Sequence, residues 1–325
     1  MSENVLVTGG AGYIGSHVCK ALYLAGYHPI VFDNLSTGHE RLVKWGPLVN
    51  GDLLNQNEVD LAFEKYKPTS VIHLAAKAYV SESVKNPIKY FRENISGSVN
   101  LIEAFLRFGG INFVFSSSCA TYGEPEISPI NETVTQSPIN PYGFTKLAVE
   151  RLLIDLRVNN TFNFGILRYF NAVGADPDGE IGELHDPETH VVPLMIKAAC
   201  ESKEFVIFGS NYETKDGTAI RDYIHVSDLA AAHVASLNHV RSKGQNLICN
   251  LGTGQGISLL DLATEMKKIM PNFKYCFGPR RAGDPKSLVA DNELSRLVLG
   301  MNYPQSQIQN ILQTAINWDQ KTKGN

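Results

Sequence analysis

The stretch Thr8-Gly9-Gly10-Ala11-Gly12-Tyr13-Ile14-Gly15 decides the fold, because it directly follows the β-branched, strand-like run 4–7. It contains the spacing G-x-G-x-x-G from Gly10 and G-x-x-G-x-x-G from Gly9. Without side chains the backbone can turn tightly and approach a pyrophosphate, and the N–H groups that open the next helix face the anion. A glycine-rich turn without a ligand is the alternative, which the flanking strand and helix disfavour. The stretch therefore predicts a dinucleotide cradle.

A carboxylate at the end of the second strand indicates which dinucleotide is bound. Asp33 follows the apolar run 29–32, about 20 residues beyond the glycines, where such a residue takes the ribose hydroxyls. It would repel a 2′-phosphate, and the following residues 34–38 contain no arginine to receive one. We therefore expect NAD rather than NADP. Asp52, after the third strand, is a candidate for the adenine edge.

The first half of the chain has the alternating pattern of a parallel sheet. Short β-branched runs alternate with amphipathic segments up to about residue 168, which is typical of β-α-β units. The segment 14–25 has apolar residues at helical spacing, and Gly26 follows where a C-cap belongs. We expect a Rossmann-type, doubly wound α/β fold. Its strands are predicted at Asn4–Val7, Pro29–Phe32, Pro47–Asn50, Ser70–Leu74, Asn112–Ser116 and Phe164–Arg168.

A second lobe is expected after residue 168, where the alternation breaks into the loop-rich stretch 176–188. A helix is predicted over 191–201, and Ser258 with Asp261 fits a capping box that opens another helix. The lobes are expected to interleave, because a strand at 222–226, a helix at 228–239 and a strand at 247–251 return to the first sheet. The predicted domains are an NAD-binding domain, residues 1–170 plus about 218–253, and a smaller α/β substrate domain, about 171–217 plus 254–325.

Composition excludes several classes of protein. The 325 residues are 43% hydrophobic and 19% charged, which is typical of a soluble globular chain and not of a disordered one. With 29 basic and 33 acidic residues and no run of like charges, nothing attracts nucleic acid or an anionic membrane. No apolar stretch approaches the ~18 residues of a membrane span, and the first four residues lack the basic region of a signal peptide.

The cysteines indicate the compartment. There are five, an odd number, widely spaced and without a C-x-x-C pair. This pattern is typical of unpaired thiols in a reducing compartment, so we expect a cytoplasmic protein with no metal site.

A tyrosine and a lysine provide candidate acid–base chemistry. Tyr142 and Lys146 are four residues apart, so on a helix they share a face. The cation can then stabilise the phenolate and lower a pKa that starts at about 10, which would make the tyrosine a general base for an alcohol proton. Ser118 ends the fifth strand, at the sheet edge where ligands bind, and could hold or relay that proton. A serine-rich loop with only local hydrogen bonds is the alternative.

Together these features resemble the extended short-chain dehydrogenase/reductase superfamily and, within it, the UDP-glucose (UDP-galactose) 4-epimerase family. The matching motifs run through nearly the whole chain, which makes the set far more specific than any one of them. Besides those above, they are Asp33-Asn34-Leu35-Ser36, His73-Leu74-Ala75-Ala76, Arg168-Tyr169-Phe170-Asn171, Asp216-Gly217-Thr218, Arg221-Asp222-Tyr223-Ile224-His225-Val226 and Arg280-Arg281-Ala282-Gly283-Asp284.

The resemblance implies a reaction and a set of site residues. Tyr142 would take the 4-hydroxyl proton while hydride passes from sugar C4 to NAD, and the resulting 4-keto sugar would turn over and receive hydride on its other face. Lys146 would hold the nicotinamide ribose and tune Tyr142, and Ser118 would bridge to the sugar. The implied cofactor-binding residues are Gly9, Gly12, Tyr13, Ile14, Gly15, Asp33, Asn34, Ser36, Asp52, Leu53, Leu74, Ala75, Ala76, Asn94, Ser116, Tyr142, Lys146 and Phe170. The implied UDP-sugar-binding residues are Ser118, Tyr142, Asn171, His190, Phe208, Arg221, Arg281, Asp284 and Leu288.

Three other functions would use part of the same set of residues. A nucleotide-sugar 4,6-dehydratase also needs acidic groups to eliminate water, and such enzymes carry an Asp-Glu pair where this chain has Cys119 and Ala120. A net dehydrogenase would release reduced NAD. A catalytically silent NAD-binding regulator would be expected to lose the tyrosine and lysine, which are both present. The sequence therefore favours epimerisation.

The identity of the sugar is left open. At Leu288, which would gate the space beside the C2 substituent, the family carries tyrosine in hexose-restricted members and small residues in permissive ones. Glucose and galactose are the expected pair, with UDP-linked N-acetylhexosamines, pentoses and uronic acids as alternatives. Lys77 is left without a role, and Cys119 is expected to be a small packing residue. Because dimers are usual in the family, we expect a homodimer formed through a four-helix interface.

Overall fold

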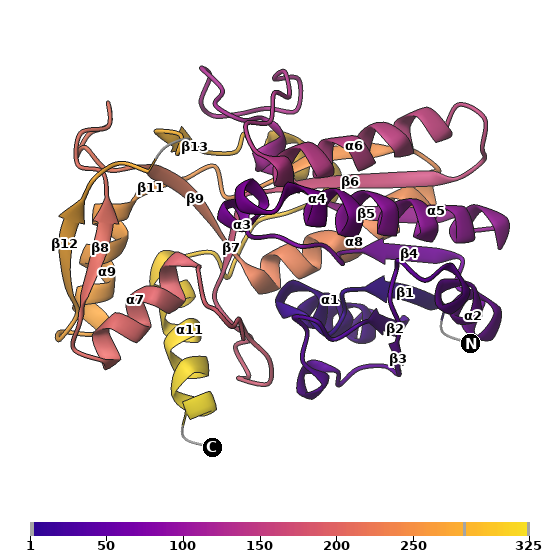
Figure 1. Ribbon diagram of the computed structural model, residues 1–325, viewed down its shortest axis with the longest axis horizontal. Helices are drawn as coiled ribbons and strands as arrows, with labels where there is room; N and C mark the ends of the chain where they lie inside the picture. The colour runs from indigo at the N-terminus through magenta and orange to yellow at the C-terminus, as the bar shows by residue number, and fades with distance from the viewer. Residues whose placement is uncertain (1–2, 282–283, 324–325) are drawn as a thin grey trace.

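The computed structural model describes residues 3–281 and 284–323. Its centre is a seven-stranded sheet of order β10-β6-β5-β4-β1-β2-β3 in which every neighbouring pair is parallel (Figure 1). This confirms the predicted doubly wound α/β fold. The strands are β1 (Asn4–Thr8), β2 (His28–Asp33), β3 (Leu48–Asn50), β4 (Ser70–His73), β5 (Asn112–Ser118), β6 (Asn163–Tyr169) and β10 (Leu247–Leu251).

Side chains alternate between the two faces of this sheet, because successive residues of a strand point to opposite sides. In β1, Val5 and Val7 enter one core with α1 and α8, whereas Leu6 enters the other core with α2, α5 and α6. All three are fully buried, so the predicted β-branched runs lie between two helical layers. The helices are α1 (Tyr13–Leu24), α2 (Gln56–Tyr66), α5 (Gly97–Arg107), α6 (Pro141–Leu156) and α8 (Val226–Lys243).

Short helical segments join these layers. The 3-10 helix η1 (Glu40–Leu42) lies between β2 and β3, and η3 (Cys119–Thr121) directly follows β5. Between β4 and α5 the chain forms α3 (Val80–Lys85), α4 (Pro87–Tyr90) and a π-helical segment, η2 (Phe91–Ser96).

A second lobe has its own core, built from α7, α9 and α11 and placed to one side of the large sheet (Figure 1). The predicted cap of α9 is confirmed, because the Ser258 hydroxyl accepts the Asp261 N–H at 3.0 Å. The elements outside the large sheet are β7 (Asn171–Val173), α7 (Val191–Cys200), β8 (Glu204–Phe208), β9 (Ile220–His225), β11 (Gly256–Ser258), α9 (Leu259–Ile269), β12 (Lys274–Gly278), β13 (Ser287–Leu288), α10 (Glu293–Leu299) and α11 (Ile308–Lys323).

One predicted strand joins a different sheet. β10 and α8 return to the first sheet as expected, but β9 pairs with β7, β11 and β13 instead. The buried carboxylate of Asp222 fixes β9 there, since it accepts N–H groups of Thr253 at 2.8 Å, Gly254 at 3.0 Å and Ala290 at 3.1 Å. The expectation for this strand was therefore wrong, because its partners come from distant segments of the chain, which its own residue pattern does not specify.

The helices found in the described residues include none with the length and apolar composition needed to span a bilayer.

Four buried histidines make stability depend on pH. Burial lowers the pKa of His17, His225 and His233 to about 4 and that of His73 to about 3. Their neutral forms are stabilising at and above the unfolded pKa of about 6.5, and this contribution is lost as the pH falls toward the folded values. Each group then lowers the free energy of unfolding by about 1.4 kcal/mol per pH unit.

We therefore expect urea denaturation to give a free energy of unfolding several kcal/mol lower at pH 5 than at pH 7. The control variant His233→Gln has no imidazole to titrate at this position. Its free energy of unfolding should fall less between pH 7 and pH 5, by the contribution of one histidine. Equal free energies at the two pH values would contradict the assignment of neutral buried imidazoles.

Candidate active site

The turn between β1 and α1 leaves no room for side chains at two glycines. Gly9 has φ +72°, and a Cβ there would lie 2.7 Å from the Ala75 nitrogen. A Cβ on Gly15 would lie 2.0 Å from the Gly9 oxygen. The first glycine thus allows β1 to turn against the end of β4, and the second lets α1 pack on the turn itself.

The start of α1 offers unpaired N–H groups. Gly12 is its N-cap, no described side chain caps it, and its first turn holds no acidic residue. The Tyr13 hydroxyl donates to the Gly174 oxygen at 2.6 Å, so this side chain is directed to the second lobe. The backbone N–H groups of Tyr13 and Ile14 are therefore the groups that suit a pyrophosphate.

Asp33 is tied to the same turn. Its carboxylate accepts the Ala11 N–H at 3.0 Å and the Leu35 N–H at 2.8 Å, with Leu35 held at φ 56°. The side chain is 8% exposed, and burial raises the pKa of this carboxyl. Each oxygen has two acceptor sites, so both keep one free for a ribose hydroxyl.

Lys77, to which the sequence assigns no role, lies beside the loop that follows Asp33. Its ammonium donates to the Ser36 hydroxyl at 2.7 Å, and its charge acts on the Asp33 carboxyl. Beside it, the Asn34 amide donates to the Asp52 carboxylate at 3.1 Å. The expected ribose and adenine residues therefore form one polar rim.

Small and apolar residues line the turn opposite this rim. The Leu74 N–H donates to the Thr8 oxygen at 3.1 Å, which holds the chain 74–76 after β4 against β1. Leu53 is buried, and the Cβ position of Gly97, at the start of α5, lies 3.1 Å from its Cβ. Leu74, Ala75 and Ala76 are only partly buried, as expected for residues that face a bound dinucleotide.

Tyr142 and Lys146 share one face of α6, as predicted. The helix is capped by Asn140, whose side chain accepts the Gly143 N–H at 2.9 Å. Tyr142 is 7% exposed and Lys146 is 3% exposed. The Lys146 ammonium donates to the Ser116 oxygen at 2.7 Å and lies 5.9 Å from the centre of the Tyr142 ring. Ser116 donates its hydroxyl to Tyr169 at 2.9 Å.

The expected lowering of the tyrosine pKa is not found in the protein alone. Burial raises the pKa of Tyr142, and the Ser118 hydroxyl opposes this shift only in part. Burial also lowers the pKa of Lys146 to about 7, which the Glu150 carboxylate opposes. Because both charged forms are desolvated and the ammonium is bound to a backbone oxygen, the lysine by itself does not make the phenol acidic.

Ser118 and Cys119 occupy the end of β5. The Ser118 hydroxyl accepts the Ala120 N–H at 3.1 Å and so caps η3. Burial raises the pKa of the Cys119 thiol to about 12, and the side chain packs with Tyr122 and Phe170. This supports the packing interpretation of Cys119, since a nucleophile would need a thiolate.

A buried ion pair behind the tyrosine was not foreseen. Arg168 donates to both Glu150 oxygens, at 2.7 Å and 3.1 Å, and to the Tyr122 hydroxyl at 2.9 Å. Ser117 also donates to Glu150, so the pair joins β5, β6 and α6. The signal in the sequence was Arg168 itself, because a cation in a buried strand requires a partner.

Asn94 also braces this region rather than standing free. It lies in η2, and its amide accepts the Lys77 N–H at 2.8 Å and donates to the Thr145 hydroxyl at 3.0 Å. The residue is 3% exposed. It therefore joins the segment after β4 to α6 beside Tyr142.

The expected nucleotide-binding residues of the second lobe form two pairs. Arg221 is ion-paired with Asp284 and donates to the Pro285 oxygen at 2.8 Å. The Arg281 guanidinium lies 4.0 Å from the centre of the Phe208 ring. The ion pair with Asp284 thus orients Arg221, and the Phe208 ring at the end of β8 orients Arg281, before any ligand binds. Ala282 and Gly283 of the same motif lie outside the described residues.

The remaining sugar-side residues lie where the lobes meet. Phe170 is buried directly after β6, and Asn171 opens β7 opposite Tyr223 of β9. Leu288, in β13 beside Arg221, is half-buried and packs against the cluster that holds Phe170 and Cys119. These residues connect the end of β6 to the arginine pairs.

His190, the last expected residue of the sugar side, contacts two carboxylates. Its Nδ1 is 2.5 Å from Glu183 and 3.3 Å from Glu188. Burial would lower the pKa of His190, but the two carboxylates outweigh it and raise the pKa to about 10. Burial would raise the pKa of Glu183, but His185 and His190 lower it to about 2. The sequence assigned no role to Glu183, His185 or Glu188.

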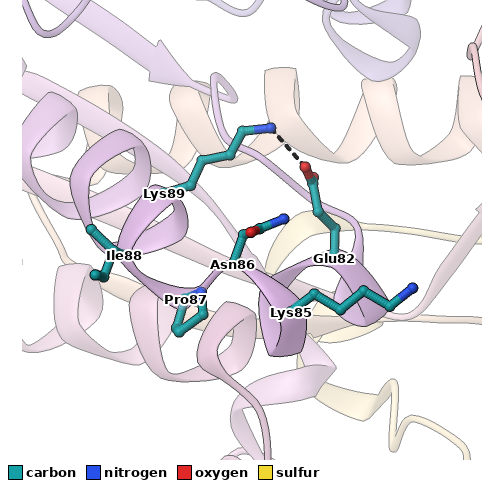
Figure 2. A pocket seen from close by; sticks show the side chains of 6 residues that line it. All are labelled: Glu82, Lys85, Asn86, Pro87, Ile88 and Lys89. Atoms are coloured by element: carbon teal, nitrogen blue, oxygen red, sulfur yellow. Dashed lines mark hydrogen bonds and ion pairs between the residues drawn. The ribbon is translucent and has the colours of Figure 1, made fainter.

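A separate hollow of about 440 Å³ lies at the turn between α3 and α4 (Figure 2). An ion pair of 2.7 Å between Lys89 and Glu82 crosses its rim. None of its lining residues belongs to the expected site, so the hollow is not where the chemistry is assembled. The lining is Glu82, Lys85, Asn86, Pro87, Ile88 and Lys89.

Comparison with known proteins places this geometry in a family. Residues 5–252 match the model of the NAD dependent epimerase/dehydratase family. A UDP-glucose 4-epimerase of Rhizobium meliloti (strain 1021) is 46% identical over 319 residues, covering 98% of this chain and 97% of the relative.

Solved structures give the same result. The UDP-glucose 4-epimerase of Brucella ovis in complex with NAD is 49% identical, with a TM-score of 0.94 over 97% of this chain and 98% of the other. That of Bifidobacterium longum, in complex with NAD+ and UDP, is 34% identical, with a TM-score of 0.92 over 98% and 99%. Family and neighbours agree with the NAD predicted from Asp33 and the glycine turn.

The glycine turn yields a testable prediction. Gly15→Ala forces a methyl group against the Gly9 oxygen, so we expect a loss of about 1–3 kcal/mol of stability and loss of copurifying NAD. Gly26→Ala is the matched control, because nothing lies within 4 Å of its Cβ position at the other end of α1. It should be less stable by about 1 kcal/mol through its positive φ and keep its NAD. Full NAD content in Gly15→Ala would contradict the cradle.

Proposed function

The chain belongs to the NAD dependent epimerase/dehydratase family, and we propose that it interconverts UDP-glucose and UDP-galactose by inverting sugar carbon C4. The observation that carries this proposal is the buried Tyr142–Lys146 pair on α6, set beside the end of β5 and the lysine's backbone partner Ser116. A phenol at this edge of a parallel sheet can reach a ligand that lies across the strand ends.

The segment after Ser118 supports epimerisation over elimination. A dehydratase needs acidic groups to remove the C5 proton and expel water from C6. Where dehydratases carry an Asp-Glu pair after the serine, η3 of this chain has Cys119 and Ala120. Burial raises the pKa of the Cys119 thiol to about 12, so it does not supply an acid in their place. The chain therefore has groups for oxidation and reduction at C4 without the acids for elimination.

In the proposed mechanism Tyr142 takes the proton of the 4-hydroxyl and later returns it. Ser118 holds the same hydroxyl, and Lys146 holds the cofactor ribose and is available to stabilise the phenolate. When bound, NAD would supply hydride transfer at C4, with Asp33 and the glycine turn holding its ribose and pyrophosphate, and the positive charge of its oxidised form would favour the phenolate. Burial raises the pKa of Tyr142, so a neighbouring positive charge is needed in this mechanism to stabilise its phenolate.

The nucleotide is held by residues far from C4. Arg281 can present a guanidinium fork to the diphosphate, and Arg221, which already donates to Ile220, Asp284 and Pro285, can offer its remaining N–H groups. Asn171 and Phe208 complete the proposed UDP-binding side. Binding energy from UDP can retain the keto sugar while its ring turns, because the remote contacts do not change during the reaction. Firm binding of UDP and loose binding of the hexose are both required for inversion.

Incubation of the protein with UDP-galactose, without added electron acceptor, tests the proposal. We expect UDP-glucose to form and no reduced NAD to be released. Free reduced NAD with a keto product would identify a net dehydrogenase, and a 4-keto-6-deoxy sugar would identify a dehydratase. Unchanged substrate would favour a regulator or another UDP-sugar, which parallel incubations with UDP-N-acetylhexosamines, UDP-pentoses and UDP-uronates distinguish.

The phenol is tested separately. Tyr142→Phe should lower kcat about 10²- to 10⁴-fold with a small change in KM, because the hydroxyl acts on a proton in transit while UDP binding is untouched. Tyr23→Phe, at an exposed position of α1, is the control and should retain full activity. An unchanged kcat in Tyr142→Phe would remove Tyr142 from the mechanism.

We also propose a homodimer. Exposed apolar side chains gather on α3, α4, η2 and α6: Val84 is 62% exposed, Ile88 74%, Phe91 40% and Phe144 48%. The Phe91 and Phe144 rings stack with centres 5.5 Å apart, and Ile88 also lines the hollow of Figure 2. An apolar patch of this kind marks an interface, and a second copy is the occupant expected from the family.

Ile88→Arg should therefore raise the dimer dissociation constant at least tenfold, or about 1.4 kcal/mol, by placing an unpaired charge in the interface. Sedimentation equilibrium measures this directly. The control is Leu297→Arg on α10, which alters an equally exposed side chain, 75%, outside the patch. A wild-type monomer at all concentrations would rule out the dimer.

We further propose that the protein works in the cytoplasm. All five cysteines are free, and Cys19, Cys119 and Cys249 are buried. Unpaired thiols persist in a reducing compartment, where disulfides are rare.

A further inference from the structure

Four side chains with metal-binding chemistry converge in the loop that connects β7 to α7. They are Glu183, His185, Glu188 and His190, called here the His/Glu cluster. One donor atom from each lies within 4.8 Å of the other three. The proposed epimerase chemistry gives no role to Glu183, His185 or Glu188, so the convergence needs a separate explanation.

Both imidazoles of the cluster turn a nitrogen toward the same carboxylate oxygen. Nδ1 of His185 is 2.9 Å, and Nδ1 of His190 is 2.5 Å, from the same oxygen of Glu183. Glu188 approaches both imidazoles, at 3.3 Å from His190 and 4.0 Å from His185. Each histidine therefore turns its Nδ1 inward, and the two rings lie 5.0 Å apart.

We propose that the His/Glu cluster binds one divalent cation of the zinc type, through two imidazole nitrogens and two carboxylate oxygens. Four ligands of this kind suit tetrahedral coordination with bonds of about 2.0–2.2 Å, which places donors about 3.4 Å apart. The four nitrogen–oxygen separations above range from 2.5 to 4.0 Å, and all donors lie within 4.8 Å of one another, so side-chain movements would admit the ion. Imidazole ligands favour zinc over magnesium.

The backbone of the loop is fixed around this centre. The backbone carbonyl oxygen of Glu183 accepts the Trp318 indole N–H at 2.9 Å, and that of Leu184 is 2.8 Å from His39 Nε2. Glu188 accepts the N–H groups of Thr189 and His190, each at 2.7 Å. Such supporting contacts orient metal ligands before the ion arrives.

Aromatic rings close two sides of the cluster. His185 packs edge-on against Tyr13 at 6.3 Å and Tyr79 at 5.8 Å, and His190 lies 6.2 Å from Tyr79. Tyr13 opens α1, so the bound cation would brace the loop against the start of the cofactor helix. Coordination through Nδ1 would leave Nε2 of His190 for other contacts.

A nearby acidic group shows the contrast. Asp176, Asp178 and Glu180 also converge, but the Lys20 ammonium lies among them at 2.8, 2.8 and 2.9 Å. That position is already filled by a cation of the chain itself. It therefore serves as a control and not as a second site.

Titration of untagged, chelator-treated protein with ZnCl₂ by isothermal calorimetry tests the proposal, with NAD content checked throughout. We expect one equivalent to bind and the melting temperature to rise. His185→Ala should weaken binding at least tenfold, and Asp178→Asn should leave it unchanged. Absence of saturable binding, or equal affinity in wild type and His185→Ala, would overturn the proposal.

A second variant keeps the test valid if His185→Ala folds poorly. Glu188→Gln preserves an acceptor for the Thr189 and His190 N–H groups and removes the charged ligand. It should also weaken zinc binding at least tenfold. Co²⁺ should give the strong visible absorption of a tetrahedral site in wild type and lose it in both variants, whereas equally tight binding of Mg²⁺ would contradict imidazole ligation.

Discussion

The close approach of backbone to backbone at the first turn is the constraint on which the rest of the structure depends. With Gly9 turned against Ala75 and Gly15 seated on the Gly9 oxygen, β1, β4 and α1 have a single relative placement. That placement fixes the loop of Asp33 on one side and, through β4 and β5, the edge that carries Ser118 on the other. Tyr142 then needs only a helix that crosses this edge, which α6 provides.

The parallel sheet could be predicted because its information is local. Runs such as Asn4–Val7 alternate between two cores, and burial on both faces demands continuous apolar residues. The placement of β9 could not be predicted in the same way. Its pattern is that of any buried strand, and the groups that Asp222 binds, next to β11 and β13, lie 31 to 68 residues away in the chain.

The site shows the same division. Tyr142 and Lys146 are placed together by helical spacing, and this needs no knowledge of the fold. The sign of the tyrosine's pKa shift needs the fold, because burial by the surrounding layers raises the pKa and the Ser118 hydroxyl opposes this only in part. The Glu150–Arg168 ion pair also depends on tertiary contact. The sequence indicates only that Arg168, in a buried strand, needs an acidic partner, and it does not say which one. For other residues, such as His190, the neighbouring sequence does not specify which groups the side chain contacts in the fold. The functions of these residues stay proposals.

The path of the chain at β9 and α8 determines how the molecule can come apart. β9 belongs to the second lobe, yet α8 begins at the next residue and packs against α1 in the first lobe. A chain cut after β7 would leave α1 and one face of the large sheet without their cover and without the edge strand β10. A gene fragment that encodes only the glycine turn and the first six strands would therefore lack α8 and β10, which cover α1 and complete one edge of the large sheet.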